Sequence, residues 1–237
     1  MKLLITAATS RLGAAAADAL GKKHDLVLTD LPGKGRAGRG GTGSAVKRHE
    51  LGHDASTDSL VKGLDGIVHV GYGGHEMEAT PLLDYLTRCT YNLLTACLAT
   101  GVRRFVYLHT LHVFDTYEPH LTVTERWKPL PGTEPPVLAA HLGEYVCREF
   151  AREHHQLEVV SLRLGFPLVD GARSAAARTK EAAALATADL ALALDLAISA
   201  KLPKRWNPLH VQSPVPGARF LMTHAEEAIG YPKKASR

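Results

Sequence analysis

Apolar residues recur along the chain in short runs that alternate with segments of helical periodicity. Each run has the length typical of strands that are buried on both faces. The predicted strands are residues 2–6, 25–29, 46–50, 66–70, 105–109 and 157–164. Between them, apolar residues at three- and four-residue spacing predict helices. The predicted helices are residues 11–20, 57–64, 81–100, 135–154 and 185–200.

This alternation predicts an α/β fold with a doubly wound parallel sheet of Rossmann type, because parallel neighbours need crossover helices on the faces of the sheet. We expect residues 1–165 to form the Rossmann domain. Residues 166–237 are expected to form a small C-terminal segment packed on the same domain, with irregular structure after residue 200. The glycine-rich residues 33–44 predict a loop.

Composition narrows the protein class. The 237 residues are 45% hydrophobic and 22% charged, which is typical of a globular domain, and no apolar run is long enough for a membrane helix. Three cysteines without CxxC spacing favour a reducing cytoplasm. The net charge of +4 favours anionic ligands in general. Nucleic-acid binding is not expected, because the basic residues are dispersed apart from residues 34–39.

The first predicted βα turn has the small residues that let a backbone approach a pyrophosphate. It contains Thr6, Ala7, Ser10, Arg11, Leu12 and Gly13. Asp30 ends the second predicted strand, where an acidic residue bonds the hydroxyls of an adenosine ribose and disfavours a 2′-phosphate. An aspartate that merely shapes a turn is an equally good interpretation. Arg36 and Arg39 in the glycine-rich loop would instead favour the 2′-phosphate.

Several motifs, in order, resemble the extended short-chain dehydrogenase/reductases of the NAD-dependent epimerase/dehydratase family, in its uronate dehydrogenase-like branch. Residues 6–13 are similar to the TGxxGxxG fingerprint, with Ala7 and Ser10 in place of glycines. The other matches are residues 53–54, 66–71, 90–107 and 225–232. The resemblance implies NAD as cofactor, with NADP as the alternative, and a sugar-like or nucleotide-sugar-like substrate.

The resemblance also implies positions for individual residues around the cofactor. Asp54 is expected at the adenine, Val70 and Gly71 beside the adenosine ribose, and Phe166 on the nicotinamide side. Tyr72 lies near the end of the fourth predicted strand, from which its phenol would reach the cleft. Residues 166–237 would lie on the substrate side. Relatives pair through the helices that correspond to residues 81–100 and 136–154, so we expect a homodimer.

The catalytic positions depart from the family pattern. Thr110 supplies the hydroxyl expected after the fifth strand, but the YxxxK pair falls on Pro136 and Ala140, and neither side chain transfers a proton. His109 and His112 flank Thr110 and are the candidate replacements, since an imidazole can act as a base near neutral pH.

Two other roles for histidines near the catalytic positions are not favoured. His141 adjoins the lost lysine but should point elsewhere, because successive helical positions differ by about 100°. No metal is expected, because His109-x-x-His112 lacks a third ligand in the sequence.

Two functions therefore remain open. One is an NAD(P)-dependent enzyme of the epimerase/dehydratase type with a nonstandard acid/base. The other is a catalytically silent dinucleotide-binding sensor or scaffold, for which the loss of the tyrosine and lysine is the main support.

Overall fold

The computed structural model describes residues 1–33, 45–72, 77–169 and 183–232. Its centre is a seven-stranded sheet in the order β3-β2-β1-β4-β5-β6-β9, and every adjacent pair is parallel. The strands are β1 Lys2–Ile5, β2 Asp25–Asp30, β3 Val46–Arg48, β4 Gly66–Val70, β5 Arg104–Thr110, β6 Glu158–Leu164 and β9 Trp206–Val211. The predicted doubly wound parallel sheet is confirmed.

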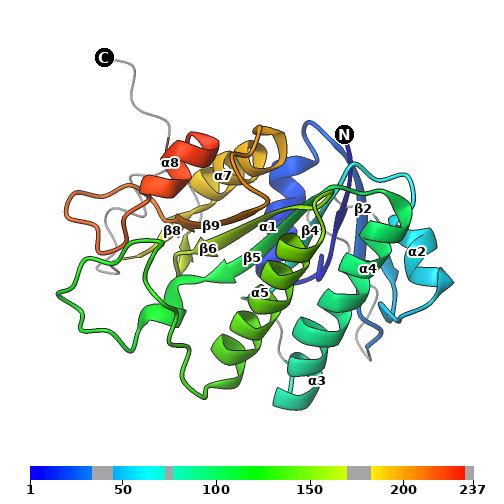
Figure 1. Ribbon diagram of the computed structural model, residues 1–237, viewed down its shortest axis with the longest axis horizontal. Coiled ribbons are helices and arrows are strands. Elements are labelled where there is room, and N and C mark those ends of the chain that lie inside the picture. The colour runs from blue at the N-terminus through cyan, green and yellow to red at the C-terminus, as the bar shows by residue number, and fades with distance from the viewer. Residues whose placement is uncertain (34–44, 73–76, 170–182, 233–237) are drawn as a thin grey trace.

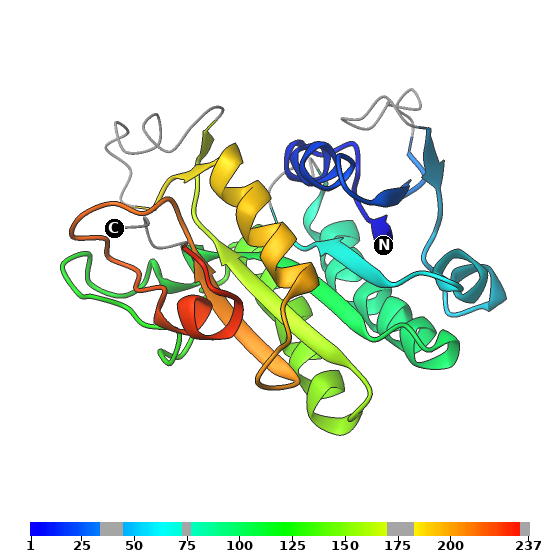
Figure 2. The same cartoon turned by 90° about the horizontal axis from the view of Figure 1, so that it is seen from above.

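Helices cover both faces of this sheet. They are α1 Arg11–Leu20, α2 Ala55–Val61, α3 Ala79–Asp84, α4 Thr90–Thr100, α5 Pro135–Glu153, α7 Thr187–Ser199 and α8 Thr223–Ile229. Figures 1 and 2 show α1 and α7 together on one face and α4 and α5 on the other. A π-helical turn, Tyr85–Cys89, joins α3 to α4, and a 3₁₀ turn, Leu111–Phe114, follows β5. No helix in the described ranges is long and apolar enough to cross a membrane.

The strands read as continuous apolar runs because both of their faces are covered. Every residue of β4 is buried, and in β5 only Arg104 is partly exposed. Local signals set the helix ends as the sequence indicates. Pro135 opens α5, where a missing N–H costs nothing, and Gly101 ends α4 with a φ of 80°.

The expectation of irregular structure after residue 200 is wrong, because β9 adds the seventh strand. Pro208 lies within that strand. A proline in the sequence disfavours a central strand, since it cannot donate a ladder hydrogen bond. In the structure β9 is the last strand in the order, where one side needs no ladder donors. A second, two-stranded sheet pairs β7 Leu168–Val169 with β8 Leu185–Ala186, so the helix predicted from residue 185 begins at Thr187. The glycine-rich loop with Arg36 and Arg39 lies outside the described residues.

Candidate functional site

Residues that follow five strands meet at one edge of the sheet. All the strands are parallel, so their carboxyl ends lie at the same edge. The residues at or just after the ends of β1, β2, β4, β5 and β6 are, in that order, Ala7, Asp30, Gly71, Thr110 and Phe166. The strand order reverses between β1 and β4, since β2 and β3 lie on one side of β1 and the later strands on the other. Doubly wound folds bind ligands at this switch point. The edge is therefore the candidate site.

In the turn after β1, Ala7 has a backbone conformation that glycine favours. Its φ is 46°, in the left-handed region. The Ser10 hydroxyl caps α1 by accepting a hydrogen bond from the Gly13 N–H at 3.0 Å. A Cβ on Gly13 would lie 2.1 Å from the Ala7 carbonyl oxygen, so glycine is required for this approach of helix to strand. Leu12 packs into the core.

Thr6 supports the edge from inside. Its hydroxyl lies 2.7 Å from His69 Nδ1, accepts the Tyr85 hydroxyl at 3.0 Å and accepts the Val70 N–H at 3.0 Å. Burial raises the pKa of the Tyr85 phenol. All four residues are buried, so the Thr6 side chain joins two strand ends through the Val70 N–H and does not reach the surface of the edge.

Asp30 and Arg11 both contact other parts of the protein. The Asp30 carboxylate accepts hydrogen bonds from the Thr9 N–H at 3.1 Å, from the Thr9 hydroxyl and from the Leu31 N–H at 2.9 Å. It thus shapes the turn, and it also keeps a negative charge at the end of β2. Arg11 Nη2 donates to the Leu168 carbonyl at 2.7 Å, which ties the first turn to the short strand β7.

Asp54 lies at the start of α2 and acts as its N-cap. Its carboxylate accepts the Ser56 N–H at 2.8 Å and the Thr57 N–H at 3.3 Å. Hydrogen bonds from Ser56 lower the pKa of the Asp54 carboxyl. The adenine contact suggested for Asp54 stays a prediction. The capping role was not recognised in the sequence, although Asp before a helix is a strong N-cap signal.

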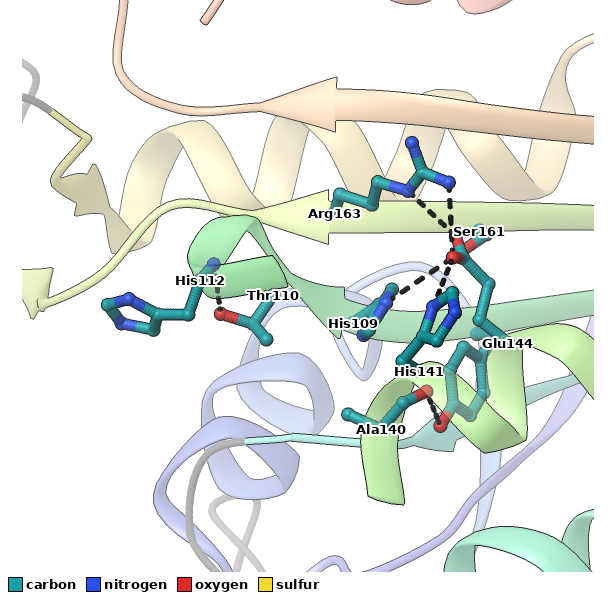
Figure 3. A network of polar contacts seen from close by, with 9 residues as sticks. His109, Thr110, His112, Ala140, His141, Glu144, Ser161 and Arg163 are labelled. Atoms are coloured by element: carbon teal, nitrogen blue, oxygen red, sulfur yellow. Dashed lines mark hydrogen bonds and ion pairs between the residues drawn. The ribbon is translucent and has the colours of Figure 1, made fainter. Parts of the chain in front are cut away.

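The end of β4 is closely packed against β5 and α5 through Tyr107. A Cβ on Gly71 would lie 2.3 Å from Tyr107 Cζ, and one on Gly143 would lie 2.3 Å from the Tyr107 hydroxyl. The ring is therefore wedged between two glycines. The hydroxyl donates to the Ala140 carbonyl at 3.0 Å, as Figure 3 shows. Burial raises the pKa of Tyr107 well above its ordinary value, so this phenol is not an available acid/base.

The end of β5 brings together four of the predicted site residues. The Thr110 hydroxyl accepts the His112 N–H at 3.1 Å and caps the 3₁₀ turn. The His112 ring lies 5.8 Å from the ring of Tyr72 and 6.1 Å from that of Phe166. Its Nδ1 is 2.7 Å from Asp115 Oδ2, a pairing of residues three apart that sequence reasoning missed. His112, Asp115 and Phe166 also line a cavity of about 200 Å³.

The sequence matches the model of the NAD dependent epimerase/dehydratase family over residues 3–227, nearly the whole chain. The chain belongs to this family. The resemblance inferred from the ordered motifs is thereby confirmed. Comparison of the sequence with the curated proteins gives no significant match.

Solved structures share the fold of this epimerase/dehydratase family member. The glucuronic acid dehydrogenase from Chromohalobacter salexigens is 22% identical, with a TM-score of 0.74 over 95% of this chain and 81% of that one. A tyrosine-to-alanine mutant of the Agrobacterium tumefaciens uronate dehydrogenase, complexed with NAD, is also 22% identical, with a TM-score of 0.74 over 94% and 81%. The UDP-glucuronic acid 4-epimerase from Bacillus cereus, in complex with NAD, is 16% identical, with a TM-score of 0.72 over 100% and 92%.

Pro136 and Ala140, to which the resemblance assigns the family's tyrosine and lysine positions, both lie in α5. Pro136 is exposed in the first turn of α5, and Ala140 is fully buried with its carbonyl bonded to Tyr107. Neither side chain can transfer a proton. The absence of the usual tyrosine and lysine pair stays a prediction from the resemblance.

His109 does not join His112 at the edge. Figure 3 shows the two rings on different sides of Thr110, with His112 pointing away from His109. His109 is fully buried, and its Nε2 lies 3.4 Å from Glu144 Oε2. Burial lowers the pKa of His109, an effect that the carboxylate of Glu144 only partly offsets. The site drawn from His109, Thr110 and His112 together is thus divided in two by the structure.

The second group centres on Glu144, a residue that the sequence did not single out. Glu144 Oε1 accepts the Ser161 hydroxyl at 2.7 Å and Arg163 Nε at 2.8 Å, and Oε2 accepts Arg163 Nη2 at 3.1 Å. Burial alone would raise the pKa of Glu144, but Arg163, His109 and His141 together outweigh it, and the pKa lies well below its usual range. His141, on α5, has Nδ1 3.8 Å from Glu144 Oε2, so this side chain faces the carboxylate. No signal in the separate sequence segments indicated this meeting of β5, β6 and α5.

Proposed function

We propose that this protein binds NAD along the carboxyl edge of its sheet and acts on a sugar or nucleotide-sugar substrate. The observation that carries the proposal is the turn after β1, with Ala7 in a left-handed conformation and Gly13 packed against it. Membership in the NAD dependent epimerase/dehydratase family supports it. Relatives of the same fold were crystallised with NAD, one of them also with UDP-glucuronic acid. The A. tumefaciens mutant lacking one tyrosine still holds NAD.

The charge of Asp30 supports NAD over NADP. Its carboxylate stands at the end of β2, where an adenosine ribose lies in this class of fold. A 2′-phosphate there would meet a like charge, while ribose hydroxyls would donate to the carboxylate. Arg36 and Arg39, which would favour NADP, lie outside the described residues.

His112 and Asp115 are the proposed acid/base pair in place of the missing tyrosine and lysine. Asp115 contacts His112 Nδ1 and thereby fixes the ring orientation, which leaves Nε2 for proton exchange. The pair lies beside Phe166 and Thr110 and lines the cavity at this edge. His109 is not part of this proposal, because its ring is fully buried.

Calorimetric titration with NAD and NADP, followed by a turnover screen on sugar acids and nucleotide sugars, tests these points. We expect micromolar NAD binding that Asp30→Ala weakens at least tenfold, and weaker binding of NADP. His112→Ala should leave NAD affinity unchanged and remove turnover, while the matched control His155→Ala, an exposed histidine after α5, should change neither. Absence of binding by any dinucleotide would refute the proposal.

A catalytically silent dinucleotide sensor or scaffold is the second candidate function. The observation that favours it is that Pro136 and Ala140, where the resemblance places the tyrosine and lysine, carry no group that transfers a proton. Tight NAD binding with no turnover on the full substrate screen, unchanged by His112→Ala, would support this function over the enzyme.

We further propose that the protein forms a homodimer through α4 and α5. Among the described residues, five large hydrophobic side chains are exposed, and three of them, Tyr91, Leu142 and Tyr145, lie on these two helices at 48%, 37% and 49% exposure. The helices lie side by side (Figure 1), and Tyr91 packs edge-on against Phe150. Sedimentation should give twice the chain mass, and Leu142→Glu should give the monomer. A monomeric wild type would contradict the proposal.

The proposed setting is the cytoplasm. Cys89, Cys97 and Cys147 are free and buried, as suits a reducing compartment.

A further inference from the structure

Two histidines and a glutamate converge in the interior between β5 and α5. His109 comes from the strand, and His141 and Glu144 come from the helix, one turn apart (Figure 3). One ligand atom of each lies within 4.8 Å of the others. We propose that His109, His141 and Glu144 hold a zinc ion. The proposal is independent of the dinucleotide site, and it replaces the expectation that His109 lacks partners for a metal.

The two separations from the carboxylate are close to those around a tetrahedral ion. Zinc bonds to nitrogen and oxygen at about 2.0–2.1 Å, so two ligands of a tetrahedral ion lie about 3.3–3.4 Å apart. Glu144 Oε2 is 3.4 Å from His109 Nε2 and 3.8 Å from His141 Nδ1. An octahedral ion with bonds of similar length would need neighbouring ligands only about 3.0 Å apart. The two imidazole nitrogens lie within 4.8 Å of each other. The donor set, two imidazoles and one carboxylate, is what favours zinc over the hard octahedral metals.

The imidazole nitrogens that face Glu144 lie within ion-pair distance of its carboxylate but make no hydrogen bond among the described residues. His109 is fully buried and neither of its nitrogens makes a hydrogen bond, and Nδ1 of His141 is likewise buried and unbonded. Burying such groups without partners is costly, and a native protein seldom leaves several of them together. A bound ion would satisfy one nitrogen of each ring at once.

The hydrogen bonds around Glu144 resemble the outer shell of a metal site, but positive charges nearby oppose a cation. Ser161 and Arg163 hold Oε1 and orient the carboxylate toward the two rings. The guanidinium of Arg163 also contacts Oε2, and its positive charge opposes a divalent cation. We therefore expect binding weaker than in a closed structural zinc centre, and tighter binding once this charge is removed.

The site has a route of entry. His141 and Glu144 line a cavity of about 320 Å³. Its other lining residues include Trp127 and four cationic side chains, Arg126, Lys128, Arg148 and Arg163, which we expect to weaken the binding of a cation further. Three protein ligands leave one tetrahedral position for water or another ligand, as in zinc sites that are not purely structural.

Calorimetry of chelator-treated protein with zinc chloride, and visible absorption after cobalt substitution, test the proposal. We expect one equivalent of zinc and the intense bands of tetrahedral cobalt. His141→Ala should weaken zinc binding at least tenfold and remove the bands, and Arg163→Gln should tighten binding. His155→Ala is the matched control and should change neither measurement. Circular dichroism identifies a variant that has lost its fold.

Two results would overturn the proposal. One is no stoichiometric zinc binding by the wild type. The other is zinc binding that His141→Ala leaves intact, or that His155→Ala removes, because the ion would then lie on surface histidines. Because zinc binding is measured without NAD, failure of the dinucleotide proposal leaves this test unaffected.

Discussion

His210 should make the protein sensitive to acid. It lies on β9, fully buried, with Nδ1 3.0 Å from the Leu221 carbonyl and its backbone paired with that of Arg163. Burial, assisted by the positive charge of Arg163, lowers the pKa of His210 from 6.5 to about 3. The folded protein therefore keeps this imidazole neutral in a pH range where the unfolded chain protonates it.

The sign and size of the effect follow from proton linkage. Between the unfolded pKa of 6.5 and the folded pKa of about 3, the unfolded state binds one more proton, so the free energy of unfolding falls as the pH falls. The slope is about 1.36 kcal/mol per pH unit. From about pH 7 to about pH 4.5, His210 alone should remove about 2.5 kcal/mol.

Urea unfolding of the wild type and of His210→Asn at these two pH values measures the effect. Asparagine retains a donor for the Leu221 carbonyl but does not titrate, so its loss of stability between the two pH values should be about 2.5 kcal/mol smaller than that of the wild type. His155→Asn, at an exposed position, should behave as the wild type. An equal loss in the wild type and His210→Asn would refute the reasoning, whatever the stability of the variant at neutral pH.

Three further substitutions test the packing around the site. Gly13→Ala places a Cβ against the Ala7 carbonyl oxygen. Urea unfolding should show a loss of about 1–3 kcal/mol of stability, and calorimetry a loss of at least about tenfold in NAD affinity. Unchanged affinity would contradict the role of the turn. Ala140→Lys, alone or with Pro136→Tyr, should lower the melting temperature sharply, because it buries a charge where Tyr107 packs; a stable variant with new turnover would show that the space exists. Tyr107→Phe removes the hydrogen bond to the Ala140 carbonyl and should lower the free energy of unfolding, measured in urea, by about 1 kcal/mol. An unchanged free energy of unfolding would indicate that water replaces the lost hydroxyl.

The architecture could be predicted from the sequence because its causes are local. A parallel strand is buried on both faces, so each strand appears as an uninterrupted apolar run, and the helices between them keep their own period. Pro135 and Gly101 mark helix ends through backbone preferences that act within one turn. The first turn was also recognisable from local sequence, since Gly13 must be small to approach the carbonyl of Ala7, only six residues before it. The pairing of His112 with Asp115 is also local, and a search for partners three residues apart would have found it.

The remaining features depend on which segments become neighbours. Nothing near Pro208 in the sequence indicates that β9 is an edge strand, because that property belongs to the strand order. His109 and Thr110 are adjacent residues, yet one is buried against Glu144 and the other caps the turn at the edge, since side chains alternate along a strand. Periodicity determines that a residue is buried but not what it is buried against. The tertiary structure decided that His109 meets two residues of α5 more than thirty positions later, because strand register and helix packing bring their side chains together.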